Sequence, residues 1–216
     1  MRRANRNLAS HAPSGSNAPP EDVSVELQRW LDGEDEKTLV SLIELFGQRG
    51  FAMLFVVLLA LPALPLPTGG ATHVFEAIAM LVALELIAGR ETIWLPARWR
   101  TLKLAGGRRE RFLVSLMKLI RRLERFSKPR LRKVFGHRLS NIAFGLVVIA
   151  WCVAAFVAPP FSGLDTLPAM GVVLLSLGVL LEDFLIVVLG LAVGVAGVTL
   201  EVVLGGAALH GLSTLF

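Results

Sequence analysis

The chain has 216 residues, of which 54% are hydrophobic and 18% charged, against roughly 25% charged residues in soluble globular proteins. This composition excludes intrinsic disorder, which requires low hydrophobicity, and it excludes collagen and coiled-coil chains. The single cysteine excludes an internal disulfide framework and any metal site made of several cysteines. A membrane protein, or a soluble protein with an unusually large core, remains.

The net charge of +5 is concentrated in the middle of the chain. Residues 98–138 contain fifteen Lys and Arg residues against two acidic residues, whereas residues 139–216 contain no Lys or Arg. A soluble domain without one basic side chain would be very unusual, so the distribution favours a membrane protein. The positive-inside rule places the basic block at 98–138 in the cytoplasm.

Two polar segments come before the first apolar run. Residues 1–20 are rich in Ser, Asn, Pro, Ala and Arg and lack the apolar core of a signal peptide, which predicts a disordered cytoplasmic tail. Residues 21–50 carry apolar side chains at helical spacing and predict amphipathic cytoplasmic helices, with Asp35 as the N-cap of the second. These helices are too polar to cross a bilayer.

Five apolar runs follow, at residues 51–66, 71–88, 141–158, 168–181 and 184–204. A helix needs about 20 residues to cross a hydrocarbon layer of roughly 30 Å, and only the last run reaches that length. The other four are predicted to be tilted, extended or re-entrant segments. We expect an all-α, polytopic membrane protein with four or five membrane helices, arranged as a first hairpin at 51–97, a second at 139–183, and a final helix and tail at 184–216.

The two halves of the chain resemble each other. The stretch from Pro65 aligns with the stretch from Pro159, and each half has an apolar run, a Pro-rich break, a hydroxyl–Gly pair and a second apolar run. Short, paired, Pro/Gly-interrupted segments are typical of binding sites in transporter folds. The repeat therefore predicts a substrate or ion site at the breaks, with two tight surface turns as the alternative. Its predicted lining is Pro65, Thr68, Gly69, Gly70, His73, Glu76, Pro159, Pro160, Ser162 and Gly163.

Ionisable groups inside the apolar runs are the strongest chemical candidates, because such groups are costly in lipid. His73 and Glu76 are three residues apart on one helical face and can form a pair that binds a cation or moves a proton. The alternative is a local hydrogen-bonded pair at the start of the helix. Glu85 points to the opposite face from Glu76, which favours a structural role.

Gly190 and Gly194 form a GxxxG pair in the longest apolar run, a spacing that permits close helix packing. The contact can lie within one chain or between chains, so a homo-oligomer stays open. The sequence contains no GxxxxGK[ST], HExxH, GxSxG or CxxC signature, its four histidines are scattered, and Cys152 is expected to be a small buried hydrophobe. We therefore expect no catalytic residues, metal or cofactor. An enzyme acting on a lipid-linked sugar is disfavoured.

The basic block contains a helix with an apolar stripe surrounded by cationic side chains. A helix of this kind beside membrane segments is expected to lie on anionic lipid headgroups. The alternative is a block that only fixes topology. Nucleic acid is disfavoured as a partner, because apolar segments flank the block and its helix has an apolar stripe. The predicted headgroup contacts are Arg49, Arg90, Arg108, Arg109, Arg121, Arg122 and Arg125.

A family resemblance is carried by ELFGQRGFAMLFVVLLALPALPLPTGGATHVFEAIAMLVALELIAGRETIWLP, LERFSKPRLR and LLEDFLIVVLG. These strings, within residues 38–195, resemble the bacterial ExoD family of exopolysaccharide synthesis proteins. The most specific pieces are Gly47-x-Arg49-Gly50, PLPTGG, Gly89-Arg90 and Trp94-Leu95-Pro96. Phe184 and Glu85 depart from the pattern, which implies Gly and Gln there.

The resemblance implies a protein of the bacterial cytoplasmic membrane connected with exopolysaccharide synthesis or export, without catalytic residues to carry over. Handling of an ion or a lipid-linked anionic substrate at the broken helices is the expected mechanism. The alternative is a non-transporting scaffold or regulator that binds the polysaccharide synthesis machinery.

Overall fold

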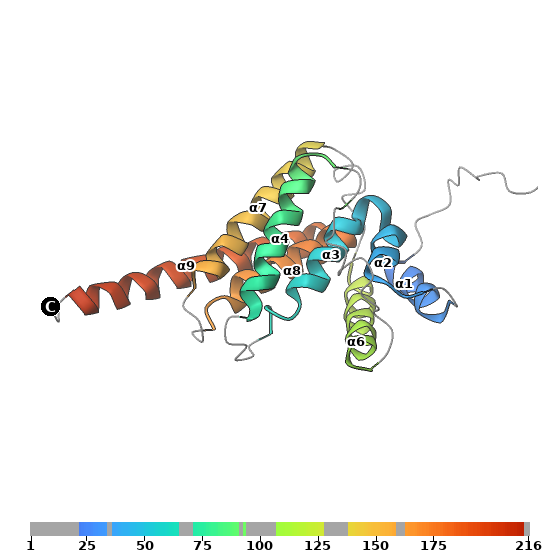
Figure 1. Ribbon diagram of the computed structural model, residues 1–216, viewed down its shortest axis with the longest axis horizontal. Coiled ribbons are helices and arrows are strands. Elements are labelled where there is room, and N and C mark those ends of the chain that lie inside the picture. Colours follow the sequence, from blue (N-terminus) through green and yellow to red (C-terminus); the bar gives the residue numbers. More distant parts are fainter. Residues whose placement is uncertain are drawn as a thin grey trace, which may run out of the picture.

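A computed structural model describes residues 22–33, 36–64, 71–90, 93, 107–127, 138–158 and 163–213. Within these ranges the chain consists of α-helices and one 3₁₀-helix, Gly47–Arg49, which confirms the predicted all-α class (Figure 1). The predicted tail at 1–20 lies outside the described residues, and so do most residues of the two predicted breaks.

Three amphipathic helices form one end of the molecule, and we call them the amphipathic subdomain (Figure 1). They are α1 (Val23–Asp32), α2 (Leu39–Phe46) and α6 (Gly107–Glu124). The apolar face of α1 buries Val23 and Leu27, and α1 packs against α6. The Ser24 amide donates a hydrogen bond of 2.9 Å to Glu124 Oε1, so α6 also satisfies a free N–H group at the start of α1.

Helix α2 begins later than its sequence predicts. Its N-cap is Thr38, whose Oγ1 accepts a hydrogen bond of 3.2 Å from the Ser41 amide, while Ser41 Oγ accepts one of 3.1 Å from the Thr38 amide. The prediction of Asp35 as the N-cap is therefore wrong. The reciprocal Thr–Ser pair satisfies free N–H groups and starts the helix at Leu39.

Five apolar helices form the rest of the described part of the chain, which we call the bundle: α3 (Gly50–Leu59), α4 (Ala71–Ile87), α7 (Arg138–Val157), α8 (Thr166–Leu180) and α9 (Phe184–Ser213). Helix α8 is buried along most of its length, with α3, α7 and α9 packed against it, while α4 packs against α3 and α7. Phe55 of α3 meets Phe144 of α7 edge to face, with ring centroids 5.6 Å apart.

A tight turn reverses the chain between α8 and α9. Glu182 takes a left-handed conformation with φ of 54°, which is uncommon for a residue with a Cβ. Directly after it, Asp183 Oδ1 accepts hydrogen bonds from the amides of Leu185 at 2.7 Å and Ile186 at 3.2 Å. This cap starts α9 within the turn, so α9 runs back along α8.

Glycines allow α8 and α9 to approach at backbone distance. A Cβ on Gly190 would lie 2.4 Å from the Leu175 amide nitrogen, and one on Gly171 would lie 2.5 Å from the Cα of Gly194. No real Cβ tolerates such distances, so these positions require glycine while the helices keep this spacing. The predicted GxxxG pair thus makes a contact within the chain.

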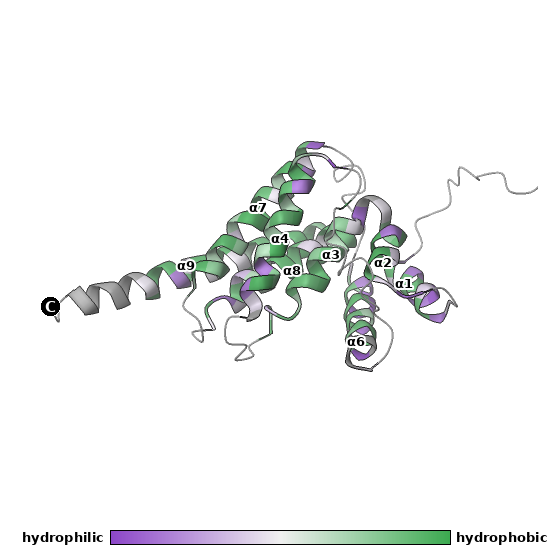
Figure 2. Ribbon diagram, in the orientation of Figure 1, coloured by the Kyte–Doolittle hydropathy of each residue, from purple (hydrophilic) through white to green (hydrophobic). Residues whose placement is uncertain are grey.

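The helices of the bundle consist mainly of hydrophobic residues (Figure 2), and many of their apolar side chains are exposed. Two helical segments, Arg138–Val157 and Phe184–Gly205, are long and apolar enough to cross a membrane, while α3 and α8 are apolar but shorter. Only 33% and 22% of their apolar windows are buried, whereas a core helix of a soluble protein would be mostly covered. Exposed apolar side chains such as Val157, Leu185 and Val202 indicate contact with lipid or another apolar partner.

The glycine interface makes a stability prediction. Gly190→Ala inserts a methyl group against the α8 backbone and should lower the free energy of unfolding by about 1–3 kcal/mol. Gly205→Ala is the matched control, because a Cβ there meets no atom within 4 Å and Ala favours helix over Gly. Thermal unfolding in detergent, followed by near-UV circular dichroism, measures both. Equal melting temperatures for the two variants would contradict the close contact.

Candidate functional site

The ends of the two predicted breaks meet in the structure. Thr72, in the first turn of α4, donates a hydrogen bond of 3.2 Å from Oγ1 to Oδ2 of Asp165, which directly precedes α8. Gly163 lies in the turn before Asp165 with φ of 69°, a left-handed conformation that favours glycine. The starts of α4 and α8 therefore lie side by side. Seven predicted lining residues fall outside the described residues: Pro65, Thr68, Gly69, Gly70, Pro159, Pro160 and Ser162.

The predicted His73–Glu76 pair is present. His73 Nδ1 lies 2.9 Å from Glu76 Oε2, and the Glu76 side chain is completely buried, whereas His73 is partly exposed. The ring of Phe156, from α7, lies over the imidazole with centroids 5.2 Å apart. The pair thus sits between α4 and α7 with its carboxyl group facing inward.

The second oxygen of the Glu76 carboxyl group is not hydrogen-bonded to any described residue. Within the described part of the chain, Glu76 Oε1 is buried and has no hydrogen-bond partner. A buried polar atom without a partner is costly, and for a charged group the cost is far larger. The site is therefore stable when Glu76 carries a proton or when a cation reaches Oε1.

Two further acidic residues belong to this site, and sequence reasoning did not single them out. Asp165 interacts electrostatically with Glu76, and Glu201 of α9 interacts with both Asp165 and Glu76. The Glu201 side chain is 9% exposed, and its Oε2 has no hydrogen-bond partner among the described residues. The signal available in the sequence was the distribution of charge, since both acids lie within residues 139–216, which contain no Lys or Arg.

The predicted headgroup contacts divide into two groups. Arg49 faces inward: its Nη1 donates a hydrogen bond of 3.2 Å to the carbonyl oxygen of Leu180, the last residue of α8, and its Nη2 lies 4.0 Å from Glu26 Oε2. It thus joins the amphipathic subdomain to the bundle. The exposed group consists of Arg90, Arg121, Arg122 and Arg125, while the side chains of Arg108 and Arg109 are outside the described residues.

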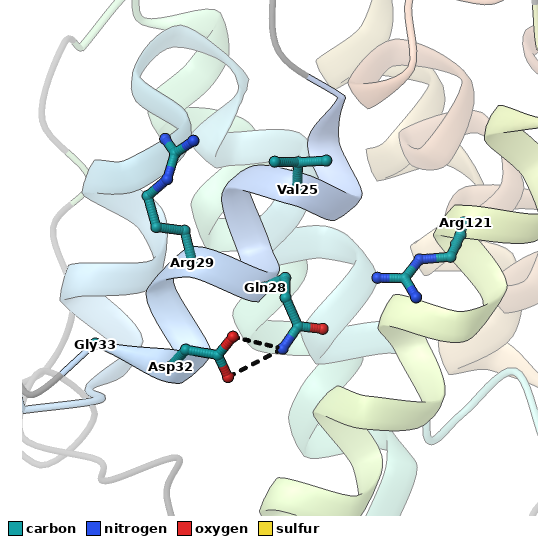
Figure 3. A pocket seen from close by; sticks show the side chains of 6 residues that line it. All are labelled: Val25, Gln28, Arg29, Asp32, Gly33 and Arg121. Atoms are coloured by element: carbon teal, nitrogen blue, oxygen red, sulfur yellow. Dashed lines mark hydrogen bonds between the residues drawn. The ribbon is translucent and has the colours of Figure 1, made fainter.

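A groove lined by Val25, Gln28, Arg29, Asp32, Gly33 and Arg121 lies between α1 and α6, beside their contact (Figure 3). Arg121 reaches from α6 toward α1, where Gln28 Nε2 donates hydrogen bonds of 3.0 Å to both carboxylate oxygens of Asp32. Arg29 and Arg121 add two positive charges to this lining against the single charge of Asp32. The groove continues the cationic face of α6 and is separate from the acidic site in the bundle.

The fold and the site define an apolar helical bundle that buries acidic side chains and carries a cationic amphipathic subdomain at one end. A family model described as "Exopolysaccharide synthesis, ExoD" matches residues 23–203, which include Glu76, Asp165 and Glu201. The chain belongs to the ExoD family. Membership implies involvement in exopolysaccharide synthesis.

Individual relatives agree with this assignment. Protein ExoD of Rhizobium meliloti (strain 1021) is 34% identical over 187 residues, which cover 83% of this chain and 76% of that protein. Uncharacterized protein slr1875 of Synechocystis sp. is 30% identical over 167 residues, covering 76% of this chain and 78% of that protein. No solved structure matches the chain.

The Thr72–Asp165 hydrogen bond can be tested by its stability. Thr72→Val removes the donor while keeping the shape of the side chain, and it should cost about 1 kcal/mol of unfolding free energy. Thr72→Ser keeps the hydroxyl group and should recover most of this loss. The midpoints of thermal unfolding in detergent compare the two. If Val and Ser are equally destabilising, the γ-methyl packing of Thr72 matters and the hydrogen bond does not.

Proposed function

We propose that this ExoD-family protein is a multi-pass protein of the bacterial cytoplasmic membrane that handles a cation or a proton, without enzymatic activity, during exopolysaccharide synthesis or export. The observation that carries the proposal is the buried Glu76 carboxyl group, with one oxygen on His73 and the other unpartnered within the described residues. Ionisable groups placed in this way inside apolar helices mark ion and proton pathways.

The negative charge of the acidic residues at the site favours a cation over a lipid-linked anion as the bound species. Three carboxyl groups, those of Glu76, Asp165 and Glu201, interact there, and His73 is the one basic side chain that the described residues bring to them. The N-terminal ends of α4 and α8 do attract negative charge, but the protein's own acids already lie beside them. An anionic sugar carrier would meet repulsion from these carboxylates.

The positions of the charged groups support a membrane orientation. The amphipathic subdomain and the Arg49 contact lie at the end of α8 that is opposite to the Thr72–Asp165 contact. With residues 98–138 in the cytoplasm by the positive-inside rule, the acidic site lies toward the outer half of the membrane. The internal repeat that the sequence predicts, of a kind typical of transporter folds, would be compatible with this arrangement.

Substitution of the buried acid tests the proposal. Glu76→Gln keeps the size of the side chain but cannot exchange a proton or carry a charge, and it should lower exopolysaccharide output several-fold in cells that carry only this copy. Glu85→Gln is the control, because it removes one carboxylate from the partly exposed opposite face of α4. Output is measured together with the amount of each variant in the membrane. Unchanged exopolysaccharide output from a correctly inserted Glu76→Gln protein would contradict the proposal.

A second candidate is a non-transporting scaffold or regulator that holds polysaccharide machinery at the membrane surface. The observation that favours it is the exposed surface of α6, which carries Arg121, Arg122 and the apolar Leu119. Directly after the helix, Arg125 is exposed and Phe126 is 84% exposed. Cationic and apolar side chains together suit an anionic lipid surface. This role is compatible with an ion site in the bundle.

Lipid retention tests the cationic face. Each basic residue near an anionic surface contributes about 1 kcal/mol, so replacing Arg121, Arg122 and Arg125 with Gln should reduce bound anionic phospholipid about tenfold or more. Lipids extracted from detergent-purified protein are quantified by mass spectrometry. Zwitterionic lipid in the same extract is the internal control and should stay constant. Equal anionic lipid in the variant and the native protein would contradict the predicted contact.

A further inference from the structure

Titratable groups face the Glu76 carboxyl group from several elements of the bundle. They are His73 from its own helix, Cys152 from α7, Asp165 from the start of α8 and Glu201 from α9. Cys152 is a buried free cysteine, and the other members of this cluster are one imidazole and three carboxyl groups.

The packing face of α9 brings Glu201 into the cluster. Gly190, Gly194, Gly197 and Glu201 follow one another at spacings of four, three and four residues, which places them on one side of the helix. The last glycine of this series, Gly197, packs on Pro168 near the start of α8. Glu201 lies one turn further on along the same face of α9, at the end of α8 that Asp165 precedes.

Glu201 is buried although its neighbours along α9 are exposed. The neighbouring residues Leu200, Val202 and Val203 are 42–68% exposed, whereas Glu201 is 9% exposed and has an oxygen without a partner in the described part of the chain. An apolar exterior and a buried acid invert the usual arrangement of a soluble protein. Together with Glu76, the bundle thus holds two buried carboxyl groups, each with an oxygen free to bind.

The arrangement of these acids fits a proton better than a metal ion. A Ca²⁺ ion takes six to eight oxygens at about 2.3–2.6 Å, and Zn²⁺ takes four ligands at about 2.0–2.3 Å. Among the described residues, no three His, Cys, Asp or Glu side chains are placed to hold a metal ion. The three acids nevertheless gather where the starts of α4 and α8 meet α9, and neighbouring buried acids are more stable when they share protons than when all of them are ionised.

We propose that Glu76, Asp165 and Glu201 form a proton relay, with Glu76 and Glu201 as its two end stations and Asp165 between them. In each step a proton leaves a carboxyl oxygen of one acid and binds a carboxylate oxygen of the next, directly or through water, so the donor becomes charged and the acceptor neutral. Thr72 is a positioning residue, because its hydroxyl group holds Asp165. The relay rests on the proposed function and names the proton as the species that the site handles.

A hydrophobic carbodiimide tests the relay, since it reacts with protonated carboxyl groups in apolar surroundings. The full-length protein in detergent is treated with dicyclohexylcarbodiimide at a series of pH values, with or without NaCl, and labelled peptides are quantified by mass spectrometry. We expect labelling of Glu76 and Glu201 that falls as the pH rises and does not respond to Na⁺. Protection by Na⁺ at constant pH would overturn the proton assignment.

A relay differs from a single-site mechanism because a change at Glu201 should alter the pH dependence of labelling at Glu76. Glu201→Gln removes a negative neighbour, so half-loss of Glu76 labelling should move to lower pH, and Glu201→Asp should restore the native profile. Glu85→Gln, which removes a carboxylate from the opposite face of α4, should leave the profile unchanged. Thermal unfolding verifies that every variant is folded.

The outcomes distinguish this inference from the proposed function. An unlabelled Glu201, or a Glu76 profile that Glu201→Gln does not change, overturns the relay, even if Glu76→Gln still lowers exopolysaccharide output. Coupled labelling with normal output from Glu76→Gln overturns the proposed function and leaves the relay standing.

Discussion

The fold depends on the contact between the backbones of α8 and α9. In an apolar environment the hydrophobic effect contributes little to helix association, so close packing of small residues has to stabilise the pair. Gly171, Gly190 and Gly194 supply this packing, because a Cβ at any of them would overlap a neighbouring helix or ring. The contact also fixes the register of the two helices, and the register places Glu201, one turn after Gly197, at the end of α8 that Asp165 precedes.

Features that depend on neighbours along one helix could be predicted from the sequence. The three-residue spacing of His73 and Glu76 predicts a contact on one helical face, and the structure has that contact at 2.9 Å. The GxxxG spacing likewise predicts which face of α9 packs closely. Such inferences succeed because the 3.6-residue period converts spacing directly into geometry.

Features that depend on the register between distant segments could not be predicted. Thr72 and Asp165 are 93 residues apart, and Arg49 and Leu180 are 131 apart. Arg49 looks like a free cation in the sequence, yet it binds the carbonyl end of α8. The prediction of the α2 N-cap was wrong for a local reason. Asp and Thr are both good N-cap residues, and the reciprocal hydrogen bonds between Thr38 and Ser41 select Thr38 over Asp35.

Helix α8 connects the two charged ends of the molecule. The Arg49 guanidinium lies at its C-terminal end and the Asp165 carboxyl group at its N-terminal end, so each charge matches the helix dipole there. Both contacts reach α8 from the first half of the chain, one from directly before α3 and one from the first turn of α4. A displacement of α8 along its axis would lengthen one contact or the other, so together they fix its axial position. That position in turn sets the distance between Asp165 and Glu76, on which any exchange of charge between the two acids depends.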